Sequence, residues 1–380
     1  MNHMLKKIVI VMLFIFIFVV GVACGNDSYV SESSHESPQD ISSLQNADSS
    51  LPSTTPELNA PLELRRFNHI SIDLFDTVTQ IIGYASSQSE FDYFRDIIIN
   101  ELAHLHKLFD IFSEYPNINN MRTINLNAGV APIEVDPIII EMLLLGIRGY
   151  EYTNGLFNIA LGPVLSIWHE YRIADANILP CMERLQAANV FTNINDVIID
   201  EINNTVFLRY ENMSLDVGGV AKGFAIEHVV QVAQNAGFNH FVLSVGGDVR
   251  MAEAPPIGER NFWNTGVRDP FGGAFTDNIV EVISGSNISV LSSGDYGRFF
   301  MVDGVRYSHI IDPTTLMPAT KYRAVTVIHP DAGINDVIIT AAFLLDIYEA
   351  TQVLNSFQAQ AVWILQDGSL VHTPGFWQYS

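Results

Sequence analysis

The chain has 380 residues, of which 48% are hydrophobic, enough to bury a sizeable core in one large domain. Its 42 acidic and 19 basic residues give a net charge of −23. This charge argues against binding to nucleic acid and against adhesion to anionic lipid. It does not exclude an anionic nucleotide that is held locally by a metal ion.

The amino terminus has the layout of a lipoprotein signal peptide. Lys6 and Lys7 precede an apolar run at residues 8–22, which is too short to span a bilayer comfortably and ends in small residues around Cys24. We predict a signal peptide at residues 1–23 and acylation of Cys24, with a simple uncleaved anchor as the alternative. Either arrangement places the rest of the chain at the extracytoplasmic face of the cell membrane.

Residues 24–62 are predicted to be the lipidated cysteine and a flexible linker. The linker is rich in Ser, Asn, Pro and acidic residues and has almost no aromatic ones, so it cannot bury enough surface to fold. If Cys24 carries lipid, Cys181 is the only thiol left and no intrachain disulfide can form. The domain at residues 63–380 must then be stable through its core alone.

The first half of this domain changes from strand-like to helical sequence. Residues 69–83 alternate and are rich in β-branched side chains, which predicts a strand pair or one long strand around Phe75. Asp136 and Pro137 have the character of an N-cap and a first helical residue. We predict helices at residues 90–112, 137–152 and 161–171, a polar loop at 153–158, and short strands at 197–200 and 205–209.

The stretch from Ser214 to Phe224 places two glycines where a strand turns into a helix. Gly218 and Gly219 let the backbone approach a ligand closely, and the helix start behind them offers N–H groups that suit phosphate. Lys222 lies in the first helical turn, where a cation is unfavourable for the helix itself, so its placement favours a bound anion. A helix entry with a solvated lysine is the alternative, and the P-loop spacing is absent.

The second half is mostly β. We predict a helix at residues 220–236, strands at 241–245, 262–268, 279–283, 288–291 and 324–329, hairpins turning at Asp303-Gly304 and Asp367-Gly368, and helices from 334 and around 348–357. No internal repeat of fixed period occurs. The pattern predicts a single large α+β domain with antiparallel-rich sheets and packed helices.

A site for a hard cation is better supported than a hydrolase or zinc site. Gly-x-Ser-x-Gly does not occur, and His104 and His106 point to different faces of their helix. Asp336 and Thr340 are four residues apart in helical sequence, so their oxygens lie on one face. The alternative is an Asp near a helix start and a Thr that bonds back to its i−4 carbonyl.

Five motifs occur in the order seen in the ApbE-type FAD:protein FMN transferases, and the chain resembles that family over everything after the linker. They lie at residues 215–223, 243–249, 292–298 and 307–313 and at Asp336-x-x-x-Thr340. The resemblance implies an extracytoplasmic, Mg²⁺-dependent enzyme that splits FAD and releases AMP. It implies that FMN is attached through a phosphoester to a Thr or Ser of an extracytoplasmic or membrane acceptor protein.

Carried over residue by residue, the resemblance also implies the site. The expected FAD contacts are Phe75, Leu156, Phe157, Asn158, Asp216, Lys222 and Ile310. The Gly219 carbonyl would ligate the metal beside Asp336 and Thr340. Phosphoryl transfer needs a cation at the pyrophosphate and an acceptor for the proton of the incoming hydroxyl, so Asp336 and His309 are the expected catalytic residues.

Two other functions would use the same residues. An FAD pyrophosphatase would take water as the acceptor and release free FMN with AMP. A non-catalytic lipoprotein would store or deliver flavin and return FAD intact.

Overall fold

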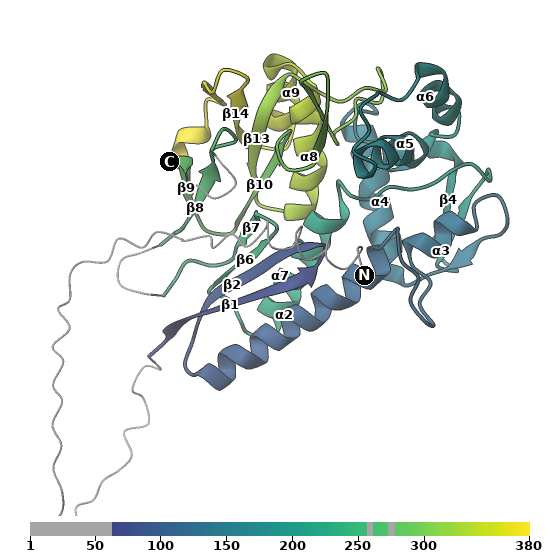
Figure 1. Cartoon of the computed structure of the whole chain (residues 1–380). Coiled ribbons are helices and arrows are strands. Elements are labelled where there is room, and N and C mark those ends of the chain that lie inside the picture. The colour runs from purple at the N-terminus through teal and green to yellow at the C-terminus, as the bar shows by residue number, and fades with distance from the viewer. Residues whose placement is uncertain (1–62, 257–260, 273–277) are drawn as a thin grey trace, which may run out of the picture.

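An eight-stranded sheet forms the centre of the computed structural model, which describes residues 63–256, 261–272 and 278–380 (Figure 1). The predicted signal peptide, Cys24 and the linker lie outside these residues. Within the described ranges, no helix is both long and apolar enough to cross a membrane. The mixture of helices with antiparallel strands confirms the expected α+β class.

The strands of this sheet follow one another in chain order, and every neighbouring pair is antiparallel. Each new strand is therefore added beside the one before it, with helices and smaller sheets inserted between. The strands are β1 (Arg65–Leu74), β2 (Thr77–Ala85), β6 (Phe241–Val245), β7 (Asp248–Met251), β10 (Ile288–Gly294), β13 (Tyr322–His329), β14 (Gln360–Leu365) and β15 (Leu370–His372).

A two-residue turn joins β1 to β2, so the strand-like sequence at residues 69–83 is a strand pair. Phe75 and Asp76 both have a φ of 53°, the left-handed conformation that this kind of hairpin turn requires. The Phe75 N–H donates to Nδ1 of His106 at 3.2 Å, and the two rings meet edge to face. Because Gly246 N–H donates to the Val78 carbonyl at 2.9 Å, the turn between β6 and β7 lies beside this hairpin.

Helices cover one face of the sheet (Figure 1). Helix α8 lies against β10, β13, α4 and α7, and nearly all of its residues are buried. The Asn335 amide donates to the Val327 carbonyl at 3.0 Å and to Ser289 Oγ at 2.9 Å, which fixes α8 to two strands. The helices of this layer are α2 (Gln88–Phe109), α4 (Pro137–Tyr152), α7 (Ala221–Asn235), α8 (Ala332–Leu344) and α9 (Ile347–Ser356).

The opposite face is covered by the β-ribbon of β8 (Trp263–Arg268) and β9 (Ile279–Gly285) and by the C-terminal 3₁₀ turn η3 (Phe376–Gln378). Trp263 and Phe376 pack there against Ile82 and Val249 of the large sheet. This second, smaller core explains why the strands in the middle of the sheet are buried on both faces.

A third group of elements lies beside the sheet, where the chain between α2 and α7 and the β11–β12 hairpin meet. Trp168 packs against Phe300, and its Nε1 donates to the Leu316 carbonyl at 2.9 Å. The elements are α3 (Met121–Leu126), β3 (Ile133–Glu134), η1 (Ile159–Leu161), α5 (Gly162–Ile173), α6 (Met182–Asn189), η2 (Ile194–Asp196), β4 (Val197–Asp200), β5 (Thr205–Leu208), β11 (Phe299–Val302) and β12 (Val305–Ser308).

Candidate active site

Lys222 lies in the first turn of α7, and its ammonium forms an ion pair with the carboxylate of Asp248 at the start of β7. The side chain of Asp248 is 6% exposed and that of Lys222 is 29% exposed. Burial alone would lower the pKa of Lys222, but the charges of Asp248 and Asp336 outweigh it and raise the pKa. The sequence predicted an anion beside Lys222, and the carboxylate of Asp248 is such an anion within the chain itself.

Asp336 is buried in α8, opposite the start of α7. Its Oδ2 accepts a hydrogen bond from the Gly223 N–H at 2.8 Å. Burial and then the charge of Asp248 raise the pKa of Asp336, and Lys222 opposes them. A Cβ added at Gly223 would lie 2.3 Å from the Ala332 carbonyl oxygen, so the glycine is what lets α7 begin this close to α8.

The residues expected to hold the metal come together at the same place. A Cβ added at Gly219 would lie 3.6 Å from Oγ1 of Thr340 and 2.9 Å from the ring of Phe157. Thr340 follows Asp336 by one helical turn of α8. The Gly-Gly turn therefore packs directly onto the helix face that carries the predicted carboxylate and hydroxyl ligands.

These donors fit magnesium if the substrate completes the coordination shell. In the part of the chain that the structure describes, no group of three or more His, Cys, Asp or Glu side chains could hold a metal by itself. Magnesium commonly binds one or two carboxylates and takes its other ligands from phosphates and water. The buried carboxylates of Asp248 and Asp336 share a single ammonium, that of Lys222, so a cation would offset the excess negative charge.

His309 carries the second feature of the site, a buried nitrogen without a partner. Its backbone N–H donates to the Arg298 carbonyl at 3.0 Å, whereas its Nδ1 has no hydrogen-bond partner among the described residues. Burial, followed by the charges of Arg298 and Arg172, lowers the pKa of His309 to about 3. The imidazole is therefore neutral at physiological pH, and a bound anion that offsets these cations would make it a stronger base.

The loop that carries three of the expected flavin contacts adjoins the Gly-Gly turn. Phe157 is buried, with its ring within contact distance of Gly149 of α4 as well as Gly219. Asn158 caps η1 by accepting from Ala160 N–H at 2.9 Å, and its amide donates to the Thr192 carbonyl at 2.9 Å. Leu156 is half-buried. Phe157 and Asn158 thus have packing and capping roles, and flavin contacts from this loop stay predictions.

The other expected flavin contacts are placed by different parts of the fold. Asp216 accepts from Gly218 N–H at 2.9 Å, and its own N–H donates to the Ile159 carbonyl at 2.9 Å. Ile310 follows His309 and accepts from Ala319 N–H at 2.8 Å. The contacts that place Phe75 are with α2 and not with the Gly-Gly turn. For all three residues, a role in FAD binding stays a prediction.

Sequence reasoning overlooked several charged residues of this site. Asp248 and Arg298 lie within the recognised motifs but received no role, and His169 and Arg172 of α5 lie outside the motifs. The only sequence signal for Asp248 is an acidic residue that follows a glycine pair at the start of an apolar stretch. No local pattern marks the other three, because their neighbours come from distant parts of the chain.

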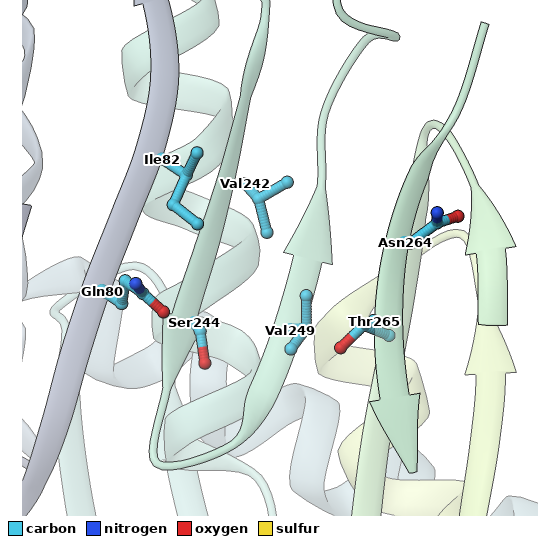
Figure 2. A pocket seen from close by; sticks show the side chains of 7 residues that line it. All are labelled: Gln80, Ile82, Val242, Ser244, Val249, Asn264 and Thr265. Atoms are coloured by element: carbon cyan, nitrogen blue, oxygen red, sulfur yellow. The ribbon is translucent and has the colours of Figure 1, made fainter. Parts of the chain in front are cut away.

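Two cavities lie away from these residues. Figure 2 shows the first, a space of about 10 Å³ between the large sheet and β8, lined by side chains that include Gln80, Ser244 and Thr265. It has room for about one water molecule, which excludes a nucleotide. The second is an open groove of about 370 Å³ beside His104 and Asp136, at the far end of α4. Neither cavity includes a residue of the candidate site.

Comparison with known proteins links this arrangement to one family. Residues 75–364 match the model of the ApbE family. A protein of Treponema pallidum (strain Nichols) named FAD:protein FMN transferase is 33% identical over 264 residues, covering 65% of this chain and 71% of that protein. A Vibrio cholerae protein of the same name is 26% identical over 242 residues, covering 63% and 71%.

Solved structures agree with these matches. The crystal structure of an ApbE protein from Thermotoga maritima superposes with a TM-score of 0.72 at 27% identity, covering 83% of this chain and 99% of that one. The flavin transferase ApbE from Vibrio cholerae superposes with a TM-score of 0.70 at 20% identity, covering 84% and 100%. At that identity the second match supports the fold alone.

Proposed function

Because the chain belongs to the ApbE family, we propose that it transfers FMN from FAD to a Thr or Ser hydroxyl of a protein and releases AMP. The names of its relatives support the reaction. The observation that carries the proposal is the meeting of Gly219, Lys222, Asp336 and Thr340 at one partly exposed junction of α7 and α8. The helix face with Asp336 and Thr340 could hold a cation, and Lys222 carries a positive charge beside it. Together they could neutralise a pyrophosphate, which is the group that this reaction cleaves.

We assign the metal to Asp336, Thr340 and the Gly219 carbonyl. Magnesium bound there would neutralise pyrophosphate oxygens and so ease separation of the leaving AMP. Lys222 supplies a second positive charge on the same group, with part of its side chain exposed for contact. The hydrogen bond from Gly223 N–H holds the Asp336 carboxylate in place at the helix junction.

His309 is the group we assign to the proton of the incoming hydroxyl. Its neutral imidazole has an Nδ1 that no described residue hydrogen-bonds, and this nitrogen can accept the proton as the oxygen attacks the FMN phosphorus. The pyrophosphate would offset the nearby charges of Arg298 and Arg172 that depress the pKa of His309. Substrate binding thus strengthens the base when the reaction needs it.

We also propose that the chain acts at the extracytoplasmic face of the membrane, anchored through a lipid on Cys24. The support for this proposal is the layout of charged, apolar and small residues at the amino terminus. Cys24→Ser should release the protein from the membrane fraction. An unchanged membrane fraction with an uncleaved amino terminus would instead support a plain anchor.

The activity test incubates the chain with FAD, Mg²⁺ and membrane proteins of its own cell. Transfer predicts AMP release together with a flavin-fluorescent protein band that survives denaturation. AMP with free FMN and no such band would indicate a pyrophosphatase, and FAD recovered intact would indicate a carrier. Either result would contradict transfer.

Variants of α8 then test the metal site. Asp336→Asn keeps the shape of the side chain and should sharply reduce turnover at limiting Mg²⁺, and Thr340→Val should act in the same direction. Asp331→Asn is the matched control, because it removes a carboxylate from the same helix while asparagine still caps the helix end. Wild-type turnover of Asp336→Asn at limiting Mg²⁺ would place the metal elsewhere.

A further inference from the structure

Helix α5 is held between the Gly-Gly turn and the turn that follows His309. At its start, a Cβ on Gly162 would lie 2.3 Å from the Ser214 carbonyl oxygen. Ser214 belongs to the irregular segment that follows β5 and leads into the Gly-Gly turn, where a strand had been predicted. Further along, Trp168 donates to the Leu316 carbonyl at 2.9 Å. Residues on this helix are thereby positioned against two parts of the candidate site, although α5 carries none of the recognised motifs.

Arg172, in the last turn of α5, makes a hydrogen bond that fixes both partners. Its Nη2 lies 2.7 Å from Nδ1 of His169. Arginine is always a donor, so Nδ1 must accept and the imidazole must be neutral with its proton on Nε2. The ring of Phe112 stacks on His169 at 5.2 Å and supports it from the other side. Arg172 is therefore a half-buried guanidinium held in one orientation by a neutral neighbour.

A second arginine and one carboxylate influence this cation, but no carboxylate of the described residues forms an ion pair with it. Burial and then the charge of Arg298 lower the pKa of Arg172, and the carboxylate of Asp216 opposes them. The charges of Arg298 and Arg172 also act on His309. No carboxylate of the described residues lies within 4.0 Å of the guanidinium groups of Arg172 or Arg298. The nearby Arg184, in contrast, pairs with Glu170 at 2.6 Å.

The position of Arg172 at a helix C-terminus offers a simpler explanation, because a cation there is favoured by the helix dipole. The dipole does not account for the bond to His169, for the half-burial, or for the approach of a second arginine. In a chain with a net charge of −23, two arginines whose charges act on each other, with no carboxylate of the described residues within ion-pair distance, point to an external anion. The partnerless Nδ1 of His309 lies in the same group.

We propose that Arg172, which His169 positions, binds a phosphate group of the nucleotide together with Arg298. This inference rests on the proposed function. This subsite adds to the positive charge of Lys222, and its planar guanidinium groups can donate two hydrogen bonds each to phosphate oxygens. The phosphate belongs either to the AMP half or to the FMN half of FAD. Phosphate recognition is common to both, and the binding test separates them.

The test measures dissociation constants of the full-length chain for AMP, FMN, adenosine and riboflavin. Arg172→Met keeps the apolar stem and removes the charge, and it should weaken binding of AMP or of FMN by roughly 10- to 100-fold. Adenosine and riboflavin lack the phosphate and should bind as they do to the wild type. Arg184→Met is the matched control, since it removes an arginine that is already paired on an exposed surface.

The ligand that loses affinity identifies the half of FAD held by Arg172. Unchanged affinity for both AMP and FMN would overturn the proposal, and so would an equal loss for adenosine and riboflavin, which would indicate a general disturbance of the fold. Because these are binding measurements, they remain decisive even if the chain transfers no FMN. Failure of the subsite is in this way distinguishable from failure of the proposed function.

His169 is tested as a positioning residue. His169→Ala should raise the KM for FAD with little change in kcat, because the guanidinium is no longer held. His169→Asn offers an amide oxygen near the position of Nδ1 and should restore the KM. Equal KM values for the alanine variant and the wild type would show that His169 does not position Arg172.

Discussion

Lys222→Met separates the two roles that the structure gives this lysine. The substitution removes the ammonium that pairs with Asp248, whose side chain is only 6% exposed. Loss of one partner from a buried pair costs about 3 to 5 kcal/mol, and the partial exposure of Lys222 places the expected loss near 3 kcal/mol. For a domain of this size, Tm should fall by about 4 to 5 °C.

FAD affinity should fall as well, for a different reason. Loss of a charge-assisted contact to the pyrophosphate costs about 1.5 to 3 kcal/mol, which corresponds to roughly a 10- to 150-fold rise in the dissociation constant. Thermal unfolding and fluorescence titration with FAD measure the two effects on the same sample. The titration must be made well below the Tm of the variant, where the protein is folded.

The double variant Lys222→Met/Asp248→Asn decides between the roles. It removes the unpaired charge along with the lysine, so Tm should return towards the wild-type value while FAD affinity remains low. Recovery of both properties would show that Lys222 serves only the fold and would refute its place in the substrate site. Asp248→Asn alone is the control for changes caused by the aspartate.

Two further changes test the packing and the electrostatics of the site. Gly223→Ala forces a Cβ against the Ala332 carbonyl, so we expect a loss of about 1 to 3 kcal/mol in unfolding free energy, whereas Gly297→Ala adds a methyl group in open space and should stay within about 0.5 kcal/mol. The pKa of His309 is about 3 in the folded chain and near 6.5 when the chain unfolds, so the unfolded state takes up a proton first and stability should decline as pH falls from 6.5 towards 3. His309→Gln should make the Tm less sensitive to pH over that range, and identical pH profiles of the two proteins would contradict the burial of a neutral imidazole.

Long periodic segments were predictable because local sequence determines them. Helix α4 begins and ends where expected, with Asp136 as its cap and Pro137 at the first position. Some short elements were missed, among them α3, α6 and β7, although the equally short strands β4 and β5 were predicted, because so few residues show periodicity only in part. The turn at Phe75 was undecided because its sequence lacks the glycine that usually marks a two-residue hairpin.

The candidate site was predictable where one helix or one turn carries it. Asp336 and Thr340 lie a helical turn apart, and Gly219 lies close to Thr340, whereas their role as metal ligands stays a prediction. The ion pair of Lys222 with Asp248 was not foreseen, because it joins the start of a helix to a strand that had not been predicted. A contact between separate elements depends on tertiary packing, which local patterns do not encode.

Because the strands of the large sheet follow one another in chain order, a chain that emerges from its amino terminus can pair each new strand with a neighbour that is already present. All but the last two strands precede α8 in the chain. The Gly-Gly turn and Lys222 are synthesised with the early part of the sheet, whereas Asp336 and Thr340 arrive only with that late helix. A chain that ends before α8 would therefore contain most strands of the sheet and still lack two residues of the proposed site, so we expect it to be inactive on the nucleotide.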